Sequence, residues 1–429
     1  MANLWYILTM YYKRLIEQKI KEKIEYSGAI LIVGPKFCGK TTTSSIFAES
    51  VVKLTTKQNI DLANVDKSFV LDGKTPRLID EWQTVPDIWN YVRDKVDEKQ
   101  KNGLYILTGS TTPSDKTNIF HSGAGRITTI KMKPLTLTES NESKGLIHLK
   151  ELFDKDPVVK IYENKNYDLM QTAFYICRGG WPNSVLAKKD KALNVTKDYY
   201  KGLFNFENSE NYKFRNKKPE ILKMVLASYA RNISTEATHT TILNDITKNN
   251  NRSINAKTLD DYMDALKDIY ILEDIAAFSP NLRSKTAIRT TNTRHFVDTS
   301  IACQALNITP QKLIKDLNTF GLFFEDFVVK ELSVYAEILD GSINHYRDKN
   351  GLECDIVINL DDGRYALIEV KLGGDKLIEE GVNTLITLSK KIDNEIHGEP
   401  AFMAVITATG PLYRRKDGIY VIPINCLSF

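Results

Sequence analysis

The sequence GAILIVGPKFCGKT, residues 28–41, decides the fold of this chain. It opens with a short apolar run rich in β-branched residues, the pattern of a strand covered on both faces. This run leads into residues 34–41, which match G-x-x-x-x-G-K-[ST] at every fixed position. A strand before this motif and a helix after it are the context that the motif requires. The stretch therefore predicts a phosphate-binding loop.

The residue types in this loop suit a triphosphate, which carries several negative charges. Glycines let backbone N–H groups curl around the β-phosphate, and a helix N-terminus adds a favourable dipole. We expect Lys40 to neutralise phosphate oxygens and Thr41 to ligate Mg²⁺, so the predicted cofactors are ATP and Mg²⁺. The alternative is a glycine turn with an incidental lysine. The predicted nucleotide-binding residues of the loop are Gly34, Pro35, Lys36, Cys38, Gly39, Lys40, Thr41 and Thr42.

Two more apolar runs follow, RLID at residues 77–80 and LYILT at residues 104–108, each separated by polar or amphipathic sequence. Strands that alternate with helices indicate a parallel, doubly wound sheet. We predict an α/β P-loop domain over residues 1–140.

Acidic and hydroxyl side chains follow these runs. Asp80 is expected to hold Mg²⁺ through water, and Glu81 to orient or deprotonate the attacking water. Alone, such an acidic pair is most often a solvated turn. Ser110, with Thr108, is placed where a sensor of the γ-phosphate would lie, although both could instead cap the next helix.

Arg126 lies in the glycine-rich sequence GAGR, residues 123–126. Its guanidinium could reach a phosphate, and if that phosphate belongs to a neighbouring subunit, Arg126 is an arginine finger. A solvent-facing loop arginine is the alternative. We list Arg126 as a catalytic candidate, with its role in cis or in trans open.

Composition narrows the class of protein. The chain has 429 residues, 42% apolar and 26% charged, as in ordinary globular domains, and its net charge of +4 does not by itself indicate nucleic-acid binding. The scattered cysteines, odd in number, indicate neither a disulfide framework nor a zinc site. The longest apolar run, residues 4–12, is too short to cross a bilayer. We expect a cytoplasmic protein without a membrane span.

The rest of the chain divides into three parts by its pattern: a helical subdomain over residues 141–217, a winged-helix-like domain over residues 218–305, and an α/β domain over residues 306–429. Basic residues after the three helical segments of the middle part could contact phosphates. The third of these segments, residues 255–270, carries four aspartates that would repel DNA. A DNA partner and a protein partner therefore both remain open. The basic residues are Arg283, Lys285, Arg289 and Arg294.

A second cluster of acids lies near the end of the chain. Asp355, Glu369 and Lys371 spell D-x(13)-E-x-K across a predicted hairpin that turns at residues 361–363. The register places Asp355 opposite Glu369, with Lys371 on the same face. Facing carboxylates need a neutralising partner, and Mg²⁺ suits them. Glu325, on the preceding helix, could add a third carboxylate.

These features, together with KMKPLTLTE at residues 131–139, GGWP at residues 179–182 and GIYVIP at residues 418–423, resemble a broad prokaryotic family of AAA-type ATP-binding proteins. The resemblance covers nearly the whole chain. It implies an ATPase core, then helices and a winged helix, then a C-terminal domain of unknown function with a restriction-endonuclease-like, PD-(D/E)xK-like fold.

In nucleases that look like this, the acids Asp355 and Glu369 would hold Mg²⁺ on the scissile phosphate while Lys371 positions or activates water. Cys354 stands where that pattern often has proline, and relatives of this kind are often suspected of having lost cleavage.

The sequence thus predicts an ATPase that couples Mg-ATP hydrolysis to action on nucleic acid or a partner protein, with a nuclease-like C-terminal domain. The alternative is a nucleotide-switched binding protein whose nuclease-like domain is catalytically silent. By resemblance, the chain could form a homo-oligomer.

Overall fold

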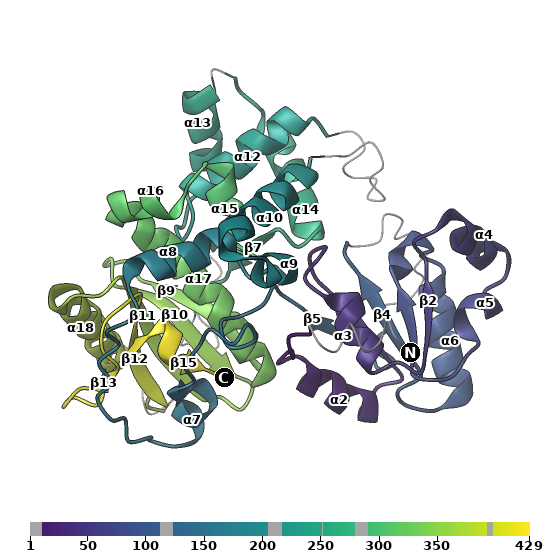
Figure 1. The fold of residues 1–429 in the computed structure, drawn as a ribbon, viewed down its shortest axis with the longest axis horizontal. Helices are drawn as coiled ribbons and strands as arrows, with labels where there is room; N and C mark the ends of the chain where they lie inside the picture. The colour runs from purple at the N-terminus through teal and green to yellow at the C-terminus, as the bar shows by residue number, and fades with distance from the viewer. Residues whose placement is uncertain (1–10, 112–122, 205–216, 251, 279–290, 393–397) are drawn as a thin grey trace. The chain divides into compact units, whose positions relative to one another are not determined.

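The computed structural model describes residues 11–111, 123–204, 217–250, 252–278, 291–392 and 398–429, and Figure 1 traces them by colour along the chain. They fall into two compact units. Unit 1 comprises residues 1–134, 201–219 and 262–271, and unit 2 comprises residues 135–200, 220–261 and 272–429.

Unit 1 is built on a five-stranded sheet with the order β2-β3-β4-β1-β5, in which every neighbouring pair is parallel. The predicted strands at residues 28–33, 77–80 and 104–108 are confirmed as β1, β3 and β4. The two outer strands were not predicted. The bounds are β1 Ala29–Val33, β2 Ser50–Lys53, β3 Arg77–Asp80, β4 Tyr105–Gly109 and β5 Ile127–Lys131.

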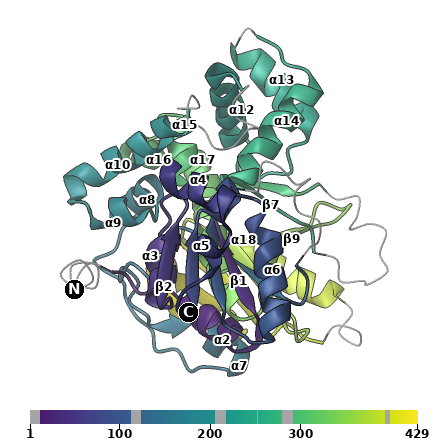
Figure 2. The same cartoon turned by 90° about the vertical axis from the view of Figure 1, so that its right-hand side faces the viewer.

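Helices cover this sheet because its central strands are apolar on both faces. All five residues of β1 are buried. Alternate residues of β1 and β4 share one core with α6, which packs against the sheet (Figure 2). The helix before β1 is α2 Glu17–Tyr26, and the elements between the strands are α3 Lys40–Ile46, α4 Lys57–Val65, α5 Ser68–Leu71, the 3₁₀ helix η1 Trp82–Thr84 and α6 Ile88–Lys99.

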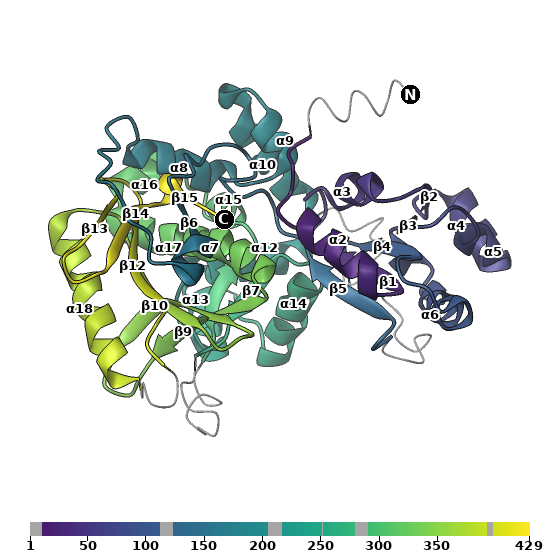
Figure 3. The same ribbon diagram turned by 90° about the horizontal axis from the view of Figure 1, so that it is seen from below.

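Unit 2 contains a six-stranded mixed sheet with the order β13-β14-β12-β11-β10-β9. The 22-residue helix α17 packs against β9, β10 and β11, and α18 runs along β10, β11 and β12 (Figure 3). The bounds are α17 Leu317–Ile338, β9 Gly341–Arg347, β10 Glu353–Leu360, β11 Tyr365–Lys371, α18 Asp375–Lys391, β12 Phe402–Thr407, β13 Tyr413–Arg414 and β14 Tyr420–Pro423.

The predicted register of the β10–β11 hairpin is confirmed. Ile356 pairs with Ile368 and Asn359 with Tyr365, and Gly363 takes the left-handed conformation in the turn, with φ of 89°. On its other side, β10 shifts register against β9 between residues 354 and 357. Asp355 therefore lies in an irregular part of the strand, next to the regular ladder with β11.

The remaining elements are mostly helical, as predicted; most lie in unit 2, whereas α14 is divided between the two units. The three helical segments expected within residues 218–305 are present as α12, α13 and α14, followed by the antiparallel pair β7–β8. The bounds are β6 Ile147–His148, α7 Leu149–Asp154, α8 Leu169–Arg178, α9 Pro182–Leu186, α10 Lys189–Gly202, α12 Pro219–Arg231, α13 His239–Asn250, α14 Ala256–Asp268, β7 Leu272–Ile275, β8 Thr293–Phe296, α15 Ser300–Ala305, α16 Pro310–Lys315, η3 Ile424–Cys426 and β15 Leu427–Ser428.

The motif GGWP at residues 179–182 has a structural role. Gly180 donates its N–H to the buried carboxylate of Asp298 at 2.8 Å and accepts from the N–H of Leu135 at 2.7 Å. A Cβ on Gly179 would lie 2.3 Å from the same Asp298 carboxylate. Only glycine fits such a close approach.

Within the described part of the chain, no helix is both long and apolar enough to cross a membrane.

Candidate functional site

The phosphate loop joins β1 to α3, as its sequence requires. Gly34 and Gly39 have φ of 154° and 103°, in the region that favours glycine. A Cβ on Gly34 would lie only 2.0 Å from the backbone oxygen of Met132, so no larger residue fits. Cys38 is fully buried, and its thiol lies 3.5 Å from that same Met132 oxygen. The cysteine side chain therefore packs against the protein.

Lys40 folds back over this loop. Its Nζ donates to the backbone oxygens of Gly34 at 2.9 Å and Pro35 at 2.8 Å, and the residue is 5% exposed. The ammonium is thus held at the loop. If a triphosphate bound there, its anionic oxygens would replace these two carbonyl oxygens as partners of the ammonium.

Thr41 and Asp80 lie together, as predicted for a magnesium site. The Thr41 hydroxyl donates to Oδ1 of Asp80 at 2.6 Å, and the Thr108 hydroxyl donates to the same oxygen at 2.6 Å. Hydroxyl and carboxylate oxygens are ligands that Mg²⁺ prefers. The three side chains come from three parts of the chain that meet at the carboxyl edge of the sheet.

Glu81 points at the same edge and is held there by its neighbours. Its backbone is left-handed, with φ of 58°, which is strained for a non-glycine residue. Its Oε2 accepts from Ser110 at 3.0 Å and from the side-chain amide of Gln83. Ser110 therefore lies beside Glu81, whereas Gln83 was not singled out by any feature of the sequence.

Arg14 is a second residue that the sequence did not reveal. Arg14 directly precedes the segment that leads into α2, and it is only 4% exposed. Its guanidinium donates to the backbone oxygens of Cys38 at 2.8 Å and Lys133 at 2.6 Å. It ties the phosphate loop to the segment that leaves β5.

Arg126 is not brought to the phosphate loop of its own chain. It directly precedes β5, and its backbone oxygen accepts from Ala29, the first residue of β1. The phosphate loop follows the last residue of β1, so a strand of five residues, about 16 Å at ~3.3 Å per residue, separates them. Arg126 instead pairs with Asp97 at 2.9 Å and is half exposed. In this structure Arg126 and the phosphate loop of the same chain thus lie at opposite edges of the sheet.

In unit 2 the predicted D/E/K residues come together on the β10–β11 hairpin. Nζ of Lys371 lies 2.6 Å from Glu369 and 3.3 Å from Asp355, and Asp355 also accepts from the N–H of Val370 at 2.7 Å. The ammonium thus bridges two carboxylates that would otherwise repel each other. Within the described residues no group of three or more His, Cys, Asp or Glu side chains is assembled as a metal site.

Burial perturbs the acids of this cluster. Glu369 is 3% exposed, and burial together with the charge of Asp355 raises its pKa from 4.5 to about 8. Burial and Asp355 also raise the pKa of Glu325 well above its ordinary value. Burial alone would lower the pKa of Lys371, but the two neighbouring carboxylates raise it. Buried carboxyl groups with a raised pKa beside a charged lysine are typical of functional sites.

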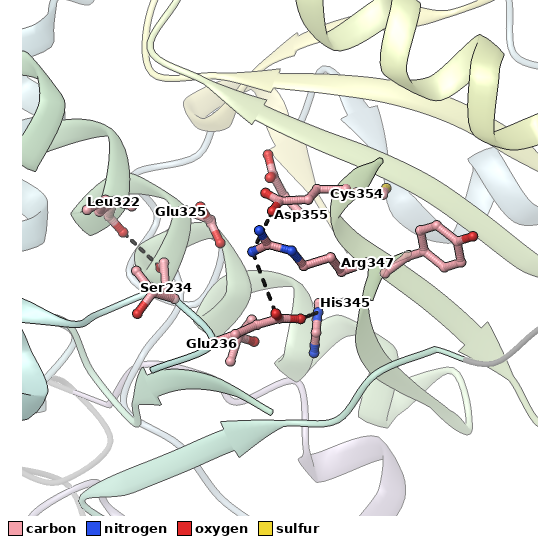
Figure 4. Close-up of a pocket in the computed structure, with 12 residues that line it drawn as sticks. Ser234, Glu236, Leu322, Glu325, His345, Arg347, Cys354 and Asp355 are labelled. Atoms are coloured by element: carbon pink, nitrogen blue, oxygen red, sulfur yellow. Dashed lines mark hydrogen bonds and ion pairs between the residues drawn. The ribbon is translucent and has the colours of Figure 1, made fainter. Parts of the chain in front are cut away.

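Glu325 and Asp355 also line a pocket of about 230 Å³ (Figure 4). Arg347 and His345, at the end of β9, form one wall, and Glu236, from the α12–α13 connection, forms another. Burial lowers the pKa of His345 to about 4, so it is neutral near pH 7. The sequence pattern did not single out Arg347, His345 or Glu236.

The prediction that the basic residues near β8 could contact phosphates is wrong for Arg294. Arg294 is 5% exposed, pairs with Asp274 at 2.8 Å and donates to the backbone oxygen of Ala237 at 2.9 Å. It is therefore a buried structural residue and not a phosphate contact. Arg283, Lys285 and Arg289 lie outside the described residues.

Comparison with known families agrees with the geometry of unit 1. Residues 26–141 match the AAA domain family, and they form an AAA-type, P-loop ATPase-like domain. Residues 170–312 match a domain of unknown function (DUF8612), and residues 320–427 match another (DUF4143).

Relatives of this chain span most of its length. An uncharacterized protein of Mycobacterium bovis and one of Mycobacterium tuberculosis are each 21% identical to it over 359 residues, which is 82% of this chain and 72% of the relative.

Two solved structures share a weaker likeness. A Walker-type ATPase of Pyrococcus abyssi is 14% identical, with a TM-score of 0.41 over 69% of this chain and 96% of that one. The ORC2 protein of Aeropyrum pernix is 11% identical, with a TM-score of 0.26 over 70% of this chain and 92% of that one. At these TM-scores the likeness is too weak to carry the assignment, which rests on the AAA domain match and the loop geometry.

Proposed function

We propose that this chain binds Mg-ATP in unit 1 and hydrolyses it. The observation that carries the proposal is the convergence of Lys40, Thr41, Asp80 and Glu81 at the carboxyl edge of one parallel sheet. Support comes from the hydrogen bonds that hold Lys40 at the loop, join Thr41 to Asp80 and join Ser110 to Glu81.

In this proposal, loop amides and Lys40 bind the phosphate tail, and Thr41 and Asp80 would hold Mg²⁺, which neutralises phosphate charge. Glu81 accepts a proton from, or orients, the attacking water. Ser110 and Gln83 fix the Glu81 carboxylate, so little reorganisation is needed before reaction. Arg126 could serve only a nucleotide in a second copy of the chain.

The substitution Glu81→Gln tests hydrolysis. It keeps the shape of the side chain but removes the base, so we expect phosphate release to fall by about 10²–10⁴-fold while ATP binding is retained. Glu98→Gln, an exposed acid on α6 that pairs with Lys95, is the matched control and should change neither. If Glu81→Gln hydrolyses ATP as fast as an active parent, Glu81 is not the base. If the parent binds ATP but releases almost no phosphate, the chain is better described as a nucleotide-switched binding protein.

A second function is favoured by the cluster on the β10–β11 hairpin. We propose that Asp355, Glu369 and Glu325, which among the described residues are not assembled as a metal site without the ion, would hold Mg²⁺, and that with Lys371 they would promote cleavage of phosphodiester bonds in nucleic acid. Support comes from the lysine that bridges the buried Glu369 and the partly buried Asp355 beside a pocket. A plasmid-cleavage assay with Mg²⁺ tests this function, since Lys371→Ala should abolish cleavage. Equal cleavage by variant and parent would contradict the proposal.

A further inference from the structure

We propose that Arg347 binds a phosphate of a nucleic-acid strand in the pocket beside the Asp355 cluster, and that Glu236 opposes this binding. The inference rests on the second proposed function and names a substrate contact for it. The observations behind it concern the residues that form the wall of the pocket, not the D/E/K residues themselves.

The pocket provides room next to the acids. A volume of about 230 Å³ is far above the ~15 Å³ that one water needs, so a group of several heavy atoms fits. Asp355 and Glu325 line one side and Arg347 faces them across the space (Figure 4). Carboxylates that hold a metal and a guanidinium that holds phosphate oxygens are complementary parts of a phosphoryl-transfer site.

Arg347 is held in place but remains accessible. It ends β9 opposite Glu353 of β10, and its Nη1 lies 2.6 Å from that carboxylate. Its side chain is 46% exposed, so the rest of its donor fork is open to a ligand. Arginine suits this task because its planar fork matches two phosphate oxygens at once.

Glu236 meets Arg347 from another part of the chain. Its Oε2 lies 3.6 Å from the Arg347 guanidinium, beyond hydrogen-bond distance. Among the described residues, the buried Oε1 of Glu236 and Nε2 of His345, which is 4% exposed, have no hydrogen-bond partner. A buried imidazole nitrogen without a partner is rare and costly, and as an N–H it would donate to a phosphate oxygen, whereas Oε1 of Glu236 already lies 3.7 Å from Nδ1 of His345.

The position of Glu236 is fixed by the backbone around it. Ser234 has left-handed φ of 56°, its N–H donates to Arg294, and its hydroxyl donates to the backbone oxygen of Leu322 at 2.9 Å. Leu322 lies on α17, one turn before Glu325. The α12–α13 connection is thereby anchored beside the acids, with one negative charge directed at the arginine that a phosphate would use.

The two roles give opposite effects on binding. Removing Arg347 deletes a charge-assisted contact, so affinity for DNA falls. Glu236→Gln keeps the size of the side chain but removes a charge that repels phosphate, so affinity rises. If Arg347 and Glu236 were merely a structural ion pair, the two variants would behave alike.

The experiment measures binding of a short fluorescein-labelled DNA duplex by anisotropy, with Ca²⁺ in place of Mg²⁺ to neutralise the acids and with gels to show that the DNA stays intact. We expect Arg347→Ala to weaken binding by about tenfold or more and to reduce the slope of log K against log salt by about 0.9. Arg347→Lys should be intermediate, and Glu236→Gln should tighten binding.

Arg364→Ala is the matched control. Arg364 is 42% exposed, lies in the β10–β11 turn and pairs with two carboxylates, Asp154 and Asp362. It lies past the far end of β10, about 17 Å or more from Asp355 at ~3.4 Å per residue. Its loss should change neither affinity nor salt slope.

Unchanged affinity and slope in Arg347→Ala, equal losses in Arg347→Ala and Glu236→Gln, or no binding by the parent would each overturn the inference. Plasmid cleavage by the parent is scored separately. If the parent cleaves the plasmid and Arg347→Ala binds DNA as tightly as the parent, only this inference is contradicted. If binding depends on Arg347 but the parent does not cleave, only the nuclease proposal is contradicted.

Discussion

Replacing Glu369 with glutamine should stabilise unit 2 at alkaline pH. Glu369 lies on β11 and is 3% exposed, and burial, with the charge of Asp355, raises its pKa from 4.5 to about 8. The folded protein therefore binds this proton more tightly than the unfolded chain does, and ionising the group opposes folding.

The sign and size of the effect follow from these two pKa values. Protonated Glu369 makes its full contribution to the unfolding free energy below about pH 4.5. This contribution is lost as pH rises through about 8. The interval from 4.5 to about 8 is roughly 3.5 units, and at ~1.36 kcal/mol per unit it sets a ceiling of about 5 kcal/mol. Glutamine does not ionise, so the variant escapes this loss.

Other groups of the cluster do not reverse the sign. The pKa of Lys371 is raised above 10.5, so it stays charged throughout this pH range and adds no slope. In the variant its ammonium keeps Asp355 at 3.3 Å and is not left unpaired. The variant also loses the contact between Lys371 and Glu369. With this loss included, we expect its unfolding free energy to exceed that of the parent by about 2 kcal/mol or more near pH 9 and to lie within about 0.5 kcal/mol of the parent near pH 5.

Urea titrations near pH 5, 7 and 9, read by hydrogen exchange in peptides from β10 and β11, measure the unfolding free energy of this region. Glu379→Gln, an exposed acid of α18 that pairs with Arg415, serves as the control and should follow the parent. A difference between Glu369→Gln and the parent that is the same at all three pH values would refute the reasoning.

Three further substitutions test the packing of the sites. Gly34→Ala should abolish ATP binding in calorimetry, because its Cβ would lie 2.0 Å from a backbone oxygen, whereas Gly202→Ala, with no atom within 4 Å of the new Cβ, should bind normally. Arg14→Ala removes two charge-assisted bonds from the loop region, each worth about 1.5–3 kcal/mol, and should weaken ATP binding about tenfold or more; unchanged affinity would contradict its positioning role. Asp326→Ala removes a fully buried carboxylate that accepts from the side chains of His295 and Thr299, and should cost about 3 kcal/mol or more in urea unfolding; a loss under about 1 kcal/mol would show that these donors find other partners.

The sequence by itself determined the elements whose causes are local. The phosphate loop followed from fixed glycines between an apolar strand and a helix, and β3 from an apolar run that ends in acids. The β10–β11 register followed from the turn, because a three-residue loop at residues 361–363 leaves one way to pair the flanking strands. In each case the deciding residues are neighbours along the chain.

Only the tertiary structure decided which distant side chains meet. Arg14 and Arg294 are charged residues that sequence patterns place at the surface, yet both are buried because backbone oxygens or an acid from remote segments satisfy them. The glycine-rich sequence around Arg126 suggested a phosphate contact. In the structure Arg126 precedes β5, which runs parallel to β1, so it lies at the opposite edge of the sheet from the phosphate loop. The pairing of Glu236 with Arg347 depends on how the α12–α13 connection packs beside α17, and no periodicity or motif encodes a contact between residues so far apart in the chain.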